Sequence, residues 1–114
     1  MGVDVTHLDQ YDSDTERGWA MYGAALLADE LGVSIVRTEY HLWTFHIPGG
    51  KYTPDFQHFT TDGQVIVVEV KGSKAQKNYR DSRTHLRAAA RINPWFIFYE
   101  ALGNQKQGIT LERI

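Results

Sequence analysis

The 114-residue sequence contains no cysteine, only three prolines and no long apolar run. The absence of cysteine excludes disulfides and thiolate metal sites, and it favours the reducing cytosol as the compartment. There is no stretch of 18 apolar residues and no basic leader ahead of an apolar segment. We therefore expect a cytoplasmic protein with neither a membrane span nor a signal peptide.

Basic residues are scarce in the first 70 positions, which hold 3 Lys and Arg against 11 Asp and Glu. Residues 71–91 reverse this balance, with 7 basic residues against Asp81 alone. A local basic segment is what meets a phosphate backbone, so the net charge of −2 does not exclude a nucleic-acid partner. The hydrophobic content of 42% is typical of a globular protein, and we expect one domain over residues 1–114.

The central segment of the chain brings two carboxylates and a lysine together. Residues 65–71 alternate like a strand, which places Glu69 and Lys71 side by side on one face. The Asp-Gly pair at 62–63 is a strong hairpin signal. We therefore expect the run 52–60 to pair antiparallel with this strand and to carry Asp55 toward Glu69.

This group of side chains suits a divalent metal ion. Asp55 and Glu69 offer the hard oxygen ligands that Mg²⁺ prefers, and the carbonyl of Val70 is a further oxygen donor. With Lys71 beside it, the ion could activate water and stabilise charge during phosphodiester hydrolysis. The alternative is an ordinary hairpin that carries a surface Glu/Lys pair.

At these residues the sequence resembles the PD-(D/E)XK nuclease superfamily, through Pro54-Asp55 and through Glu69-Val70-Lys71 at the end of a hydrophobic strand. The resemblance covers roughly residues 13–100. It is closest to small phage-type members and is also similar to archaeal-type Holliday junction resolvases. It implies an α/β fold with a restriction-endonuclease-like core, in which helices flank a mixed central sheet. It also implies Mg²⁺ as cofactor, with Mn²⁺ able to replace it, and a bacterial or phage-infected cell.

Residues 14–31 are predicted to form a helix, because Ser13 to Glu16 reads as a capping box and Gly32 as a stop. Helical periodicity places Glu16 at the top of the apolar face. Two explanations stay open: Glu16 closes the capping box with Ser13, or it reaches the metal cluster as a further ligand or water-holder. The nuclease superfamily has a glutamate on its first helix, which the resemblance places at Glu16.

The remaining elements are predicted from their residue types. Residues 33–37 and 40–47 are expected to be the first strands of the central sheet, and residues 95–102 and 109–114 its last. Residues 1–12 are expected to form a loose arm. Histidines 41 and 46 are expected more as strand-face groups than as metal ligands.

A second helix is predicted within residues 73–93, regular from about Ala75 or Tyr79. Cations recur along it at steps of three or four residues, and an anionic partner would relieve their mutual repulsion. A solvated basic face is the alternative. The residues expected to hold the DNA backbone are Lys74, Lys77, Arg80, Arg83 and Arg87.

Together these expectations predict that the protein is an Mg²⁺-dependent endodeoxyribonuclease. Asp55 and Glu69 would bind the metal, Lys71 would act on the attacking water, and Glu16 would complete the site. A chain this small has little surface for reading bases, which favours branched or junction DNA and a homodimer. The alternative is a DNA-binding module that keeps this fold but is non-catalytic or depends on a partner.

Overall fold

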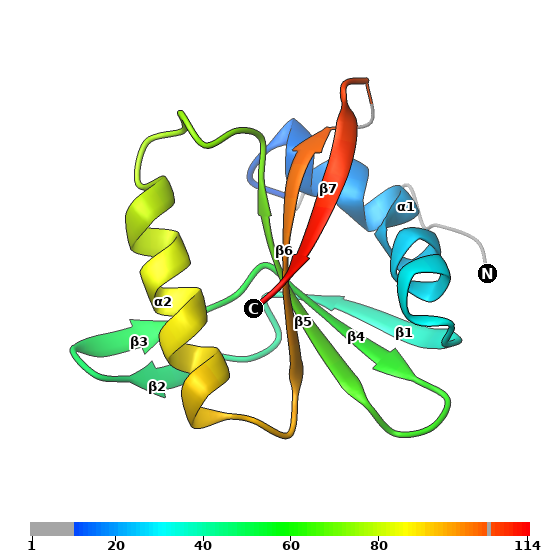
Figure 1. Ribbon diagram of the computed structural model, residues 1–114, viewed down its shortest axis with the longest axis horizontal. Helices are drawn as coiled ribbons and strands as arrows, with labels where there is room; N and C mark the ends of the chain where they lie inside the picture. The colour runs from blue at the N-terminus through cyan, green and yellow to red at the C-terminus, as the bar shows by residue number, and fades with distance from the viewer. Residues whose placement is uncertain (1–10, 105) are drawn as a thin grey trace.

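The computed structural model describes residues 11–104 and 106–114, which form a five-stranded sheet with one helix on each face (Figure 1). The helices are α1 (Asp14–Leu31) and α2 (Tyr79–Ile92). In spatial order, the strands of this central sheet are β1 (Ile35–Tyr40), β4 (Phe56–Thr60), β5 (Val65–Lys71), β6 (Ile97–Asn104) and β7 (Gly108–Arg113). Within the described residues, no helix has the length and apolar character needed to cross a membrane.

The sheet is mixed. Neighbouring strands are antiparallel except for β5 and β6, which are parallel and joined through α2. A parallel pair needs such a crossover, because the chain must return to the same end of the sheet. The α/β class with helices flanking a mixed sheet is therefore confirmed.

The predicted hairpin around Asp62 and Gly63 is confirmed. Strands β4 and β5 pair antiparallel, with Phe59 opposite Val65, and Gly63 takes the positive φ of 85° that the turn requires. Alternation along β5 divides its side chains between two cores. Ile66, Val68 and Val70 pack in the core with α1, whereas Val67 packs in the core with α2.

The prediction that residues 40–47 form a strand of the central sheet is wrong. Tyr40 ends β1, and His41 follows in a left-handed conformation (φ 53°) that a strand cannot contain. The short strands β2 (Phe45–Ile47) and β3 (Gly50–Tyr52) form a separate two-stranded sheet that packs beside α2. Its aromatic and apolar side chains are buried in the core on that face.

Smaller boundaries also differ from the sequence-based expectation. Helix α2 begins at Tyr79, the later of the two predicted starts. The expected arm at 1–12 lies outside the described residues except for Tyr11 and Asp12. The Tyr11 ring packs edge-on against Tyr40 with 4.6 Å between centroids, so this part of the segment is held against the sheet.

Trp19 holds α1 on the sheet through a buried polar contact. Its indole N–H donates to Nε2 of His58 (3.0 Å), and Nδ1 of His58 lies 2.8 Å from the Thr38 hydroxyl. Since Nε2 accepts, the neutral ring carries its proton on Nδ1 and donates to Thr38. A side chain at Gly23 would lie 2.2 Å from the indole, so only glycine leaves room for this ring.

Burial lowers the pKa of His58 to about 3. Below pH 6.5 the His58 ring is protonated in the unfolded chain but stays neutral in the folded chain. The neutral histidine therefore contributes stability that is lost as pH falls from 6.5 toward 3. The loss can reach about 1.4 kcal/mol per pH unit. In denaturant titrations, His58→Gln should flatten this acid limb, and the exposed His46→Gln should not. Equal acid limbs in parent and His58→Gln would contradict the assignment.

Candidate active site

Asp55 lies at the end of the sheet where β4 begins and β5 finishes. Its Oδ2 accepts the Val70 N–H (2.8 Å), and its main-chain carbonyl accepts the His41 N–H (2.9 Å). The buried Gln57 amide supports this turn, accepting from the Leu42 N–H (2.9 Å) and donating to the Pro54 carbonyl (3.4 Å). Asp55 is thus fixed in place, with 13% of its side chain exposed.

Glu69 and Lys71 project side by side from β5, as predicted. The Lys71 ammonium lies 3.5 Å from Glu69 Oε2, and the buried Tyr52 hydroxyl donates to Glu69 Oε1 at 2.6 Å. Only 7% of the Glu69 side chain and 15% of the Lys71 side chain are exposed. Tyr52 therefore fixes one oxygen of this carboxylate, and the other faces the lysine.

Glu16 approaches the same place from α1. Ser13 caps the helix by accepting the Glu16 N–H (3.1 Å), and its hydroxyl also donates to Glu16 Oε1 (3.1 Å). The second oxygen, Oε2, accepts the Tyr40 hydroxyl at 3.0 Å. The inward placement of Glu16 is therefore confirmed, and its carboxylate contacts the capping serine while it faces the other acids.

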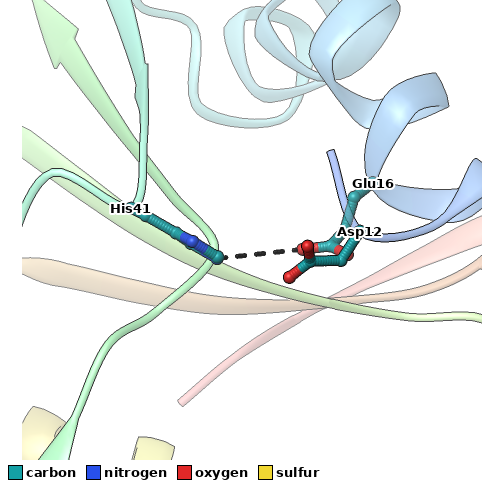
Figure 2. Close-up of side chains that lie close together, drawn as sticks. All are labelled: Asp12, Glu16 and His41. Atoms are coloured by element: carbon teal, nitrogen blue, oxygen red, sulfur yellow. Dashed lines mark ion pairs between the residues drawn. The ribbon is translucent and has the colours of Figure 1, made fainter. Parts of the chain in front are cut away.

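His41 lies between two of these carboxylates. Its Nε2 is 3.6 Å from Asp55 Oδ1 and 4.0 Å from Glu16 Oε2, and its ring stacks on Tyr40 with 3.8 Å between centroids. Figure 2 shows the imidazole directed toward Glu16, with Asp12 beside that carboxylate. One ligand atom from each of Asp12, Glu16 and His41 lies within 4.8 Å of the others, so these three could also share a metal ion.

The electrostatics of the cluster centre on Asp55. Burial and the neighbouring Asp55 charge raise the pKa of Glu69 to about 8 and that of Glu16 to about 7. The Asp55 carboxylate also raises the pKa of His41. We call Glu16, Asp55 and Glu69 the carboxylate cluster. A cation among them would favour the ionised forms, because it would oppose the burial and the repulsion from Asp55 that raise these pKa values.

The predicted DNA-contacting residues divide into two groups. Four of them are exposed on the loop before α2 and on the helix itself: Lys74, Lys77, Arg80 and Arg87. Arg83 differs, since 13% of its side chain is exposed and its guanidinium donates to buried Glu100 (2.6 Å) and to Glu112. Arg83 therefore anchors α2 to β6 and β7.

Several residues around the cluster were missed by sequence reasoning. Tyr40 and Tyr52 hold Glu16 and Glu69, but nothing in the spacing of these tyrosines indicates which carboxylate they reach. His41 was placed on a strand face, whereas the end of β1 directs it to Asp55. Val70, predicted to offer its carbonyl, contacts the cluster through its N–H.

Comparisons with known proteins add no relative. No family model, curated protein or solved structure matches the chain. The functional argument therefore depends on the geometry and chemistry of the site.

The raised pKa of Glu69 predicts a pH dependence of stability in metal-free protein. The folded chain keeps a proton that the unfolded chain loses above pH 4.5, so this contribution to stability is lost as pH rises toward 8. The slope can reach about 1.4 kcal/mol per pH unit. Unfolding in EDTA should show this decline, and Glu69→Gln should reduce it. Exposed Glu30→Gln is the control; a Glu69→Gln slope equal to that of the parent would refute the prediction.

Proposed function

We propose that this protein is a metal-dependent endodeoxyribonuclease with a restriction-endonuclease-like core of the PD-(D/E)XK type. The observation that carries the proposal is the convergence of Glu16, Asp55 and Glu69, with Lys71 beside Glu69 at 3.5 Å. Folding alone gives no reason to gather three partly buried carboxylates whose charges repel one another. Perturbed titratable groups of this kind concentrate at functional sites.

The donor chemistry of the cluster fits Mg²⁺. Asp55, Glu69 and Glu16 present hard carboxylate oxygens. Burial and repulsion from Asp55 raise the pKa values of Glu16 and Glu69, and a divalent cation would oppose both effects. Mn²⁺ accepts the same ligands and tolerates the nitrogen of His41 as well. When bound, the ion would supply a polarised phosphate oxygen and a water of lowered pKa.

The chain's own groups have separate tasks in this proposal. The Val70 N–H and the Tyr52 hydroxyl fix the orientations of Asp55 and Glu69, so the ligands need not reorganise. The Lys71 ammonium would orient the attacking water and stabilise the negative charge that develops on the phosphate. Glu16 would complete the ligand set or hold a water molecule, while Tyr40 and Ser13 keep its carboxylate in position.

DNA is the proposed substrate because a row of exposed cations leads away from Lys71. Lys74, Lys77, Arg80 and Arg87 would hold phosphates, and such contacts position a duplex without reading its sequence. This favours selection by DNA shape, such as a branch or junction, whose paired cuts would need a homodimer. We call these four cations the basic row. They alone favour the second candidate, which is a DNA-binding module that is non-catalytic or depends on a partner.

Cleavage assays on the cluster variants test the proposal. Asp55→Asn, Glu69→Gln and Lys71→Ala should each reduce Mg²⁺-dependent cleavage at least about 100-fold, because each removes part of a preorganised electrostatic site. Linear, flapped and four-way DNA should be compared with Mg²⁺ and with EDTA. The exposed Asp29→Asn and Glu30→Gln are matched controls that should retain activity. Cleavage by a folded variant at the parental rate would remove that residue from the mechanism.

Glu16 can be tested apart from its capping partner. Glu16→Gln removes a metal ligand and should slow cleavage at least about tenfold while the melting temperature holds, since glutamine also serves in a capping box. Ser13→Ala should lower stability by about 1 kcal/mol and should slow turnover less than Glu16→Gln does, because Tyr40 still holds the Glu16 carboxylate. If Glu16→Gln cleaves at the parental rate, the carboxylate acts only in the cap.

A further inference from the structure

A hollow of about 410 Å³ lies between α2 and the C-terminal end of β7. We call it the α2–β7 groove. In Figure 1 the C-terminal end of β7 lies near α2, whereas the rest of the strand runs away from the helix. The residues that line the groove are Arg83, Arg87, Ala90, Arg91, Glu112, Arg113 and Ile114. Small-molecule pockets are mostly apolar, whereas most of these residues carry a charge.

The groove has more positive than negative charge. Its four arginines face Glu112 on the surface, with Glu100 buried beneath Arg83. Arg83 forms ion pairs with both glutamates, and its hydrogen bond to Glu112 keeps the pKa of that carboxyl below its ordinary value. Arg87, Arg91 and Arg113 are exposed, and no carboxylate of the described residues lies within ion-pair distance of them. Three guanidinium groups from two elements thus surround one concavity.

The spacing of these arginines continues the basic row. Arg87 and Arg91 are four residues apart and follow Arg80 on the same side of α2. Arg113 adds a cation from β7, across the hollow. The row therefore runs from the loop after Lys71 along the helix to the groove. A linear polyanion that enters at the carboxylate cluster could follow this row, whereas a compact anion would occupy one position only.

We propose that the α2–β7 groove binds a phosphodiester of a nucleic-acid backbone, with Arg91 and Arg113 joining Arg87, which is already among the four cations assigned to DNA. This inference deepens the proposed function and rests on it for the choice of DNA over an acidic protein segment. Arginine suits the position, because its planar fork donates two parallel hydrogen bonds to phosphate oxygens. The groove lies along the later turns of α2, whereas Lys71 precedes the loop that leads into that helix, so DNA bound at both would extend along the length of α2.

Salt-dependent binding tests the groove independently of cleavage. Fluorescence anisotropy with a 20-base-pair duplex, of about 68 Å at 3.4 Å per pair, would be measured in a Lys71→Ala background. Arg91→Gln with Arg113→Gln should lower the slope of log affinity against log salt by about 2, and weaken binding roughly 10- to 100-fold near 0.1 M salt. The control variant, Lys51→Gln with Lys106→Gln, removes the same charge from exposed positions outside the groove. It should change the slope and the affinity less than the Arg91/Arg113 variant does.

The outcomes separate the two proposals. If the Arg91/Arg113 variant shows the same slope and affinity as the Lys51/Lys106 control, the proposal that the groove binds DNA is wrong. This holds even if the Asp55 and Glu69 variants lose cleavage. Loss of DNA binding by the Arg91/Arg113 variant would support DNA binding in the groove, even if the parent protein cleaves no DNA. Displacement of the duplex by polyglutamate at equal charge concentration, but not by single-stranded DNA, would overturn it in favour of an acidic protein segment. Should the double variant unfold, Arg91→Gln alone should lower the slope by about 0.9.

Discussion

The contact between the Asp55 carboxylate and the Val70 N–H is the point on which the candidate active site depends. It ties the turn before β4 to the end of β5, and the Asp55 carbonyl ties the same turn to His41 at the end of β1. Glu16 comes from α1 on one face of the sheet, whereas Glu69 belongs to the face that α2 covers. Side chains from opposite faces can meet only where the sheet ends, and Asp55 occupies that place.

The two faces of the sheet handle buried polar groups differently. On the α1 face, His58 is neutral and satisfied by Trp19 and Thr38, so its burial adds rigidity without a net charge. On the α2 face, Glu69 and Glu100 are buried as acids and need Tyr52, Lys71 and Arg83 as partners. Buried acids of this kind favour function over stability, because their desolvation is offset only while every partner stays in place.

Local signals in the sequence predicted much of this arrangement. The capping residues bounded α1, the Asp-Gly turn fixed the β4–β5 hairpin, and strict alternation placed Glu69 beside Lys71. The sequence could not predict that His41 would leave β1 in a left-handed conformation, which costs a non-glycine residue about 1–2 kcal/mol. Nor could it assign Tyr52 to Glu69 or Arg83 to Glu100, since these pairings depend on how α2 and the small sheet pack together.

Glu69 and Glu100 stand opposite each other on the parallel strands β5 and β6. Neighbouring strands are about 4.8 Å apart, so two buried acids share one small region and differ only in their partners. Removing Arg83 alone would leave Glu100 as an unpaired buried charge, whereas replacing both with apolar groups can be nearly neutral. Replacing Arg83 first would leave the buried acid without a countercharge, whereas replacing Glu100 first leaves Arg83 its ion pair with Glu112. The order in which these two positions change therefore decides whether the fold has to tolerate a buried charge.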